Sequence, residues 1–205
     1  MVLRFALASA VALALTGCNA ITAIGDATSP LAVFELRAAE QPRASRQTDD
    51  HIIIELPNTT GALDTDRIMI KPDPLRAQYL PDVRWSDSAP VMMQTLMLRS
   101  LESTEAVSYV GRRPLGPGGD YAVLTELLDF QAELNANGET ATVRLRMIVR
   151  LLREQDTRIV ASRTFNASAE SASTETVALA AAFDAAAKSL MTGFTGWTLS
   201  ELGMR

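Results

Sequence analysis

Three segments in the second half of the chain alternate between hydrophobic and polar residues. They cover residues 121–134, 143–151 and 159–167, with turn-forming stretches at 135–138 and 154–158 between them. A period of two places neighbouring side chains on opposite faces of a strand, so the pattern predicts three consecutive strands. Because the turns are short, we expect an antiparallel meander with one face exposed to water.

Two other segments repeat their apolar residues every three or four positions, which is the spacing of one face of a helix. The first helix is expected to begin at Asp87 or Ser88, either of which can cap it, and to continue to Leu101. The second is expected over 174–202, with Ser173 as its N-cap. Each helix can therefore pack one apolar face against a sheet.

Shorter apolar runs earlier in the chain predict further strands, at 31–37, 52–56, 67–71, 77–80, 83–85 and 106–110. Polar stretches at 38–50, 58–64 and 111–119 read as loops, and Pro72 is expected to end the strand before it. Strands and helices do not alternate strictly. The pattern therefore favours an α+β fold in one domain, 31–205: a largely antiparallel sheet with two main helices packed on one face.

The amino terminus has the composition of a secretory signal. Its apolar run, 5–15, is too short for a helix that crosses a hydrocarbon layer of about 30 Å. The run leads into Leu15-Thr16-Gly17-Cys18, which resembles the bacterial lipobox. The lipobox implies that residues 1–17 are a lipoprotein signal peptide and are removed. Cys18 would then carry a thioether-linked diacylglycerol, and its amino group would be acylated by a fatty acid such as palmitate.

The segment that follows reads as a tether between this lipid and the domain. Residues 18–30 are mostly small and polar and end in a proline. Each buried CH2 of an acyl chain contributes about 0.8 kcal/mol, so several chains give a stable anchor. Asn19 stands where enteric bacteria place an aspartate for retention in the inner membrane. This favours the outer membrane over the inner one, with the domain facing the periplasm.

Composition excludes several kinds of site. A single cysteine rules out an intrachain disulfide, and zinc sites made of four cysteines or of two cysteines and two histidines. The net charge of −5 lacks the basic excess of a nucleic-acid-binding protein. His51 is the one histidine, and Asp64-Thr65-Asp66 lacks the glycine and terminal glutamate of a calcium loop. We therefore expect no metal site and no nucleic-acid partner.

Patterns typical of enzyme active sites are also missing. The glycine-rich stretch 116–119 is not followed by Lys-Ser or Lys-Thr, so it is not a phosphate-binding loop. The chain has no Gly-x-Ser-x-Gly motif of a hydrolase. Glu126 and Asp129 are expected on opposite faces of one strand, where they cannot act as an acid/base pair. The sequence thus predicts a protein without catalytic activity or cofactor.

Two charged or aromatic groups have more than one interpretation. Three arginines, Arg144, Arg146 and Arg150, share one face of a predicted strand. They either pair across strands with Glu126 or Glu133, which we favour, or form a docking surface for an acidic partner or anionic lipid.

The second group is Arg84-Trp85-Ser86-Asp87, at the start of the first predicted helix. Trp85 can bury a large ring beside the helix, and Arg84 can stack on an aromatic face. Asp87 is one of the two candidates for the helix cap. These roles favour a structural interpretation of the group.

Several of these motifs occur in an order that resembles a known family. The lipobox comes first, then Ile54-Glu55-Leu56-Pro57, the stretch 63–68, Tyr79-Leu80 and the Arg84-Trp85 group. The chain resembles the ABC-type transport auxiliary lipoprotein family, which includes the lipoprotein partners of MCE-type (mammalian-cell-entry domain) lipid transport systems. The positions that match the family motif are Asp66, Arg67, Tyr79, Arg84, Trp85 and Asp87.

The resemblance implies a non-catalytic periplasmic lipoprotein that works beside an ABC ATPase, a permease and an MCE-domain protein. Such a system moves phospholipid or other hydrophobic molecules across the cell envelope. The matching residues would either contact a partner or define the fold, and homo-oligomers are left open. The alternative is a stand-alone envelope lipoprotein that serves as an assembly or structural factor of the outer membrane.

Overall fold

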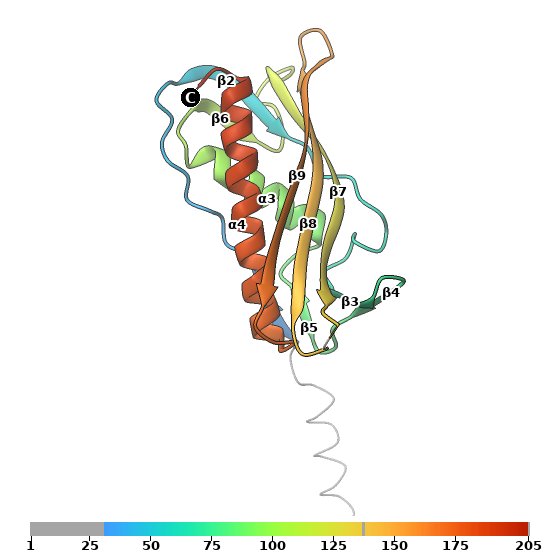
Figure 1. Cartoon of the computed structure of the whole chain (residues 1–205). Coiled ribbons are helices and arrows are strands. Elements are labelled where there is room, and N and C mark those ends of the chain that lie inside the picture. The colour runs from blue at the N-terminus through green and yellow to red at the C-terminus, as the bar shows by residue number, and fades with distance from the viewer. Residues whose placement is uncertain (1–30, 137, 205) are drawn as a thin grey trace, which may run out of the picture. The chain divides into compact units, whose positions relative to one another are not determined.

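Three long strands form the body of the sheet (Figure 1). The computed structural model describes residues 31–136 and 138–204, and Val33–Arg205 is one compact unit. In sequence order, the antiparallel strands are β7 (Tyr121–Leu134), β8 (Ala141–Arg153) and β9 (Arg158–Ser171). The residues of β8 that alternate inward, from Ala141 to Leu151, are buried, and the others are more exposed. The meander predicted from the period of two is thus confirmed.

The free side of β7 carries two separate pairs of strands. Its first residues pair in parallel with β2 (Thr48–Ile54), which pairs in parallel with β6 (Val107–Gly111). Its last residues pair in parallel with β3 (Met69–Asp73), which pairs antiparallel with β4 (Arg76–Tyr79). The main sheet is therefore mixed, with parallel pairs where the chain returns to β7. β1 (Ala32–Phe34) and β5 (Val83–Trp85) form a small second sheet.

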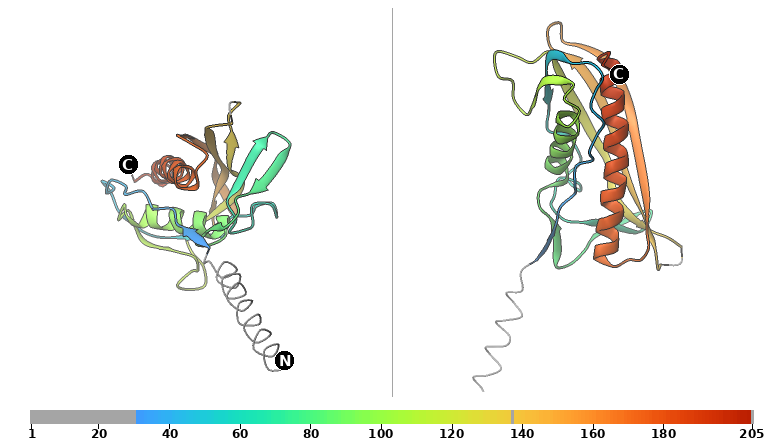
Figure 2. Two further views of the ribbon diagram at one scale, coloured as in Figure 1. Left: turned by 90° about the horizontal axis from the view of Figure 1, so that it is seen from below. Right: turned by 90° about the vertical axis from the view of Figure 1, so that its left-hand side faces the viewer.

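Two helices cover the inward face (Figure 2). α4 (Thr176–Glu201) packs on β8 and β9, and α3 (Ala89–Glu102) packs on β2, β6 and α4. α4 is long and apolar enough to cross a membrane, but in this fold half of its most apolar window is buried inside the protein. The α+β class, with both helices on one face of the sheet, agrees with the prediction.

A β-bulge in β7 changes which residues share a face. Leu127 pairs with Met147 and Asp129 pairs with Arg146, so Leu128 is the extra residue. The strict alternation predicted Leu127 and Phe130 on opposite faces, yet both are buried in the core. Glu126 and Asp129 consequently point to the same outer face, and the prediction that they face apart is wrong. One inserted residue reverses the alternation of every later position.

Several predicted boundaries also differ. β3 continues through Pro72 to Asp73, where a register irregularity accommodates a residue that lacks an N–H donor. The expected loop 38–50 already contains the start of β2 at Thr48. The N-cap of α4 is Glu175 and not Ser173, whose hydroxyl instead accepts the N–H of Glu175.

Candidate functional site

The residues that match the family motif meet where the segment before β3 crosses β5. The carbonyl of Asp66 accepts the N–H of Trp85 (2.7 Å), and its Oδ2 accepts a hydrogen bond from Nη1 of Arg84 (3.2 Å). The carbonyl of Thr65 accepts the N–H of Ala89 (3.1 Å) at the start of α3. These bonds hold the motif segment against both β5 and α3.

Arg67 and Tyr79 form a second pair beside it. The guanidinium carbon of Arg67 lies 4.6 Å from the centroid of the Tyr79 ring, which is the geometry of a cation–π contact. The Tyr79 hydroxyl donates to the carbonyl of Ala62 (2.9 Å). The pair therefore links β4 to the turn before β3. Arg67 and Arg84 both lie on the outside of the domain, so their charged groups remain accessible.

Trp85 lies at the centre of an aromatic cluster and is 0% exposed. Its ring makes edge-to-face contacts with Phe183 (5.1 Å between centroids) and Phe130 (5.9 Å), which also contact each other. The residue thereby joins β5, β7 and α4. Its Nε1–H is buried without a hydrogen-bond partner within the described part of the chain, so the indole is held by packing alone.

The start of α3 confirms one of the two predicted caps. Asp87 is exposed, and the N-cap of α3 is Ser88, whose side chain makes no capping bond. Pro90 occupies the first turn, where no N–H donor is needed. Arg84 pairs with Asp66 instead of stacking on a ring, because the neighbouring Trp85 ring is fully enclosed. Cys18 lies outside the described residues.

Three arginines that share one face of β8 each have a carboxylate partner on β7. Nε of Arg144 lies 2.7 Å from Glu133, Nε of Arg146 lies 2.5 Å from Asp129, and Nη1 of Arg150 lies 4.0 Å from Glu126. The predicted cross-strand pairing is confirmed. The bulge at Leu128 adds Asp129 to this face, which the alternation did not predict. Each of these three guanidinium groups thus lies within 4.0 Å of a carboxylate, which favours the pairing interpretation over a docking surface.

An ion cluster inside α4 was not predicted. The carboxylate of Asp184, 7% exposed, accepts the backbone N–H of Arg37 (2.9 Å) and its Nε (3.1 Å), and Nζ of Lys188 lies 2.9 Å away. Burial alone would raise the pKa of Asp184, but the hydrogen bonds from Arg37 and Lys188 outweigh it and lower that pKa to about 2. The signal in the sequence is a lone carboxylate within the alanine-rich stretch 179–187.

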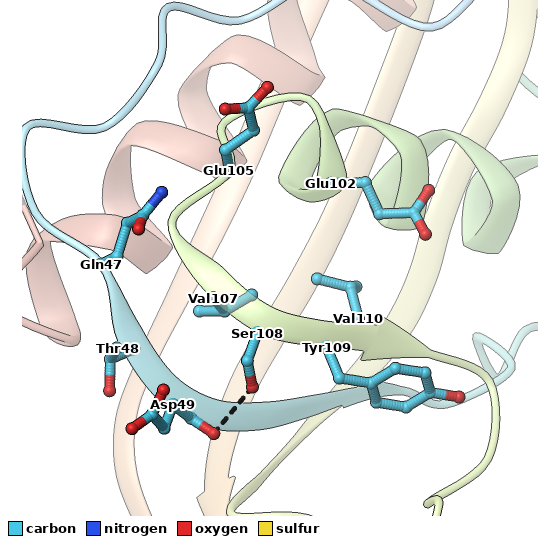
Figure 3. Close-up of a pocket in the computed structure, with 9 residues that line it drawn as sticks. All are labelled: Gln47, Thr48, Asp49, Glu102, Glu105, Val107, Ser108, Tyr109 and Val110. Carbon is cyan, nitrogen blue, oxygen red and sulfur yellow. Dashed lines mark hydrogen bonds between the residues drawn. The ribbon is translucent and has the colours of Figure 1, made fainter.

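A groove of about 580 Å³ lies at the other end of the sheet, beside β6 (Figure 3). We call it the β6 groove. Its lining comes from the start of β2, the end of α3 and β6 itself: Gln47, Thr48, Asp49, Glu102, Glu105, Val107, Ser108, Tyr109 and Val110. Within residues 31–136 and 138–204, no three His, Cys, Asp or Glu side chains gather in a way that could hold a metal ion.

A family model and several known proteins are similar to this chain. The model of the family described as ABC-type transport auxiliary lipoprotein component matches residues 34–193. All six motif positions from Asp66 to Asp87 lie inside the match, and Cys18 lies before it. An uncharacterized protein of Bradyrhizobium diazoefficiens, bll6063, is 27% identical over 180 residues, which are 85% of this chain. The match spans only 47% of the length of that relative.

Solved structures share the architecture. Protein XCC0632 from Xanthomonas campestris superposes with a TM-score of 0.73 and 27% identity, over 83% of this chain and 95% of that one. The crystal structure of another uncharacterized protein gives a TM-score of 0.63 at 9% identity, over 83% and 99% of the two chains, and shows the fold alone. The match to the family model covers most of the chain, and the protein therefore belongs to the family of ABC-type transport auxiliary lipoprotein components.

Proposed function

We propose that this protein is a non-catalytic, lipid-anchored auxiliary component of an MCE-type ABC transporter. The transporter would move phospholipid or other hydrophobic molecules across the cell envelope. The observation that carries the proposal is the family match over residues 34–193, which begins shortly after a lipobox-like sequence. The ATPase and permease would supply the energy and the membrane passage, and an MCE-domain protein would bind the transported molecule.

Cys18 is the proposed attachment point to the membrane. Its acyl chains would hold the domain at the periplasmic face of a membrane, and Asn19 favours the outer membrane. The lipid anchor would then keep the protein beside its partners, because several buried acyl chains are sufficient for stable attachment.

The motif residues divide into three proposed roles. The enclosed Trp85 would define the fold, since it joins two strands and a helix through aromatic contacts. The exposed Asp87 and the accessible guanidinium groups of Arg67 and Arg84 would contact a partner. Asp66 and Tyr79 would position those two arginines, through an ion pair and a cation–π contact.

The experiment that tests the function measures lipid movement in cells. A strain that lacks the gene should transfer labelled phospholipid between its two membranes more slowly, and the wild-type chain should restore the rate. Arg67→Ala with Arg84→Ala should restore it less well, whereas the matched control Arg158→Ala with Arg163→Ala, on β9, should restore it fully. If transfer of phospholipid and of other labelled hydrophobic molecules is normal in the deletion strain, the stand-alone envelope lipoprotein becomes the better reading.

A further inference from the structure

One edge of the main sheet ends at β6, which pairs only with β2 within the described part of the chain. The carbonyl of Ala106 accepts the N–H of Thr48 (2.9 Å), so the backbone groups of Ala106 face β2. Backbone groups of successive residues in a strand point to opposite sides, which turns those of Val107 and Tyr109 away from β2. These N–H and C=O groups line an open edge that a further strand can join.

The β6 groove includes four residues of this edge strand, Val107 to Val110, together with the start of β2 and the end of α3 (Figure 3). Its apolar lining residues are Val110, 7% exposed, and the half-buried Val107. Tyr109 is also half buried, since its ring packs edge-to-face on His51 (5.5 Å between centroids) and its hydroxyl donates to the carbonyl of Arg113. The groove thus combines the open edge of β6 with apolar side chains beside it, the two features that an added strand uses.

The charge of the lining identifies the chemistry of the occupant. Asp49, Glu102 and Glu105 supply three carboxylates, and none of the lining residues is Lys or Arg. Arg43, outside the lining, pairs with Glu105 (2.8 Å) and leaves the groove with a negative balance. A segment with Lys or Arg side chains gains from this field, whereas an acidic segment is repelled.

The groove is also clear of the point where the chain enters the domain. The carbonyl of Phe34 in β1 accepts the N–H of Ser86, just after β5. Figure 1 shows β5 at one end of the sheet and β6 at the other. The groove and β5 therefore lie at opposite ends of the sheet.

We propose that the β6 groove binds an extended, Lys- or Arg-containing segment of a partner protein, which adds to β6 as a new edge strand. The proposal rests on the proposed function, in that the segment would belong to a component of the transporter. Backbone hydrogen bonds from Val107 and Tyr109 would hold the segment, and the three carboxylates would select its charge.

Two fluorescent eight-residue peptides test the charge selection in fluorescence anisotropy with the purified mature protein in detergent. One alternates Lys and Val, and the other alternates Glu and Val. We expect the Lys–Val peptide to bind and the Glu–Val peptide to bind at least tenfold more weakly. Binding that does not distinguish the two peptides, or no binding of the Lys–Val peptide at millimolar concentration, overturns the proposal.

Variants locate the binding. Glu102→Gln with Glu105→Asn removes two carboxylates, and asparagine suits the left-handed backbone of Glu105 (φ 52°). This variant should weaken Lys–Val binding roughly tenfold. The matched control, Glu35→Gln with Glu175→Gln, makes the same change in charge at two exposed carboxylates outside the groove and should leave binding unchanged. If both variants weaken Lys–Val binding equally, the cause is the net charge of the protein and the groove is not the binding site.

The backbone part of the proposal has its own test. A Lys–Val peptide methylated at alternate backbone nitrogens keeps its charge but cannot donate along one edge. If the peptide adds as a strand, methylation of one of the two alternate sets of peptide nitrogens should abolish binding. The unmodified peptide should also protect the backbone amides of Val107 and Tyr109 from hydrogen exchange. Unchanged binding of both methylated peptides contradicts strand addition. Self-association of the protein that protects the same amides and blocks the peptide would assign the edge to a second copy, against the proposal.

These results are independent of the transport experiment. Peptide binding together with normal lipid transfer in the deletion strain would support the binding site in the groove and reject the role in a transporter. Slower lipid transfer without peptide binding would reject the binding site alone.

Discussion

The carboxylate of Asp184 accepts both the backbone N–H and the Nε–H of Arg37, a residue 147 positions earlier in the chain. The two bonds attach the segment after β1 to the middle of α4. Since Lys188 lies one helical turn further on, at 2.9 Å, the buried carboxylate is matched by two cations. An ion pair, as well as apolar packing, thus joins the segment after β1 to the last helix of the domain.

Asp184→Asn should lower the free energy of unfolding at pH 7 by about 1 to 2 kcal/mol, because the folded state holds the pKa of this carboxylate at about 2, below its ordinary 3.8. A lowered pKa stabilises the fold at pH values above 3.8, and this contribution disappears as the pH falls from 3.8 towards 2. Urea unfolding at pH 7 and near pH 2 measures the difference.

The difference between the wild type and Asp184→Asn should therefore shrink at low pH. Asp156→Asn is the matched control, since Asp156 pairs with Arg153 in an exposed turn and should affect stability little. A destabilisation by Asp184→Asn that is as large near pH 2 as at pH 7 would contradict the electrostatic explanation.

Trp85→Ala should cost about 3 to 5 kcal/mol of unfolding free energy, the range for removing a buried aromatic side chain. The variant leaves Phe130 and Phe183 without the ring between them. Trp85→Phe should cost less, about 1 to 2 kcal/mol, because it keeps an aromatic ring and removes the unbonded indole N–H. Urea unfolding followed by circular dichroism checks both values, and a larger loss for phenylalanine than for alanine would refute the packing account.

Deletion of Leu128 should be tolerated better than other single deletions in the sheet. Without this extra residue, Leu127, Asp129 and Phe130 keep their present faces and their partners on β8. The local twist of the bulge is lost, so we expect a lower melting temperature but a cooperative unfolding transition.

Deletion of Ile148, in the regular part of β8, is the control, because it turns one half of that strand inside out. It should abolish the cooperative transition. Similar behaviour of the two deletion variants would show that the bulge does not set the faces of β7.

The local pattern predicted the elements whose period is uninterrupted. The meander and both helices follow from apolar spacing that repeats over many residues, and the cross-strand partners Glu126 and Glu133 follow from the wet face of β7. The bulge could not be predicted in this way, because an extra residue becomes visible only against the partner strand. A proline is expected to end a regular strand, but β3 has a register irregularity between Ile70 and Asp73 and can therefore contain Pro72.

The candidate sites depend more on contacts between distant segments. Arg84 and Asp66 were identified together from the motif, but their ion pair requires β5 to lie beside the segment before β3. The β6 groove combines the start of β2 with the end of α3, two segments with no shared motif. The carboxylates of the groove lie near the ends of these elements, where they belong to no repeating pattern of apolar and polar residues. The sequence pattern therefore could not predict the groove.

Cys18→Ala should release the protein from the membrane or leave its signal peptide uncleaved, because the nucleophile for lipid attachment is lost. Fractionation of the envelope with sedimentation at high salt, and the mass of the purified chain, measure the two outcomes. Normal processing of this variant together with membrane association as tight as that of the wild type would disprove the lipid anchor.

The most direct test of the account is the recovery of partners with the tagged protein from envelopes dissolved in a mild detergent. We predict that an MCE-domain protein, an ABC permease and its ATPase are recovered in fixed ratios to the tagged chain, identified by mass spectrometry. An unrelated lipoprotein with the same tag and signal peptide serves as the control. Recovery of the tagged chain without any of the three components would contradict the assignment to a transporter.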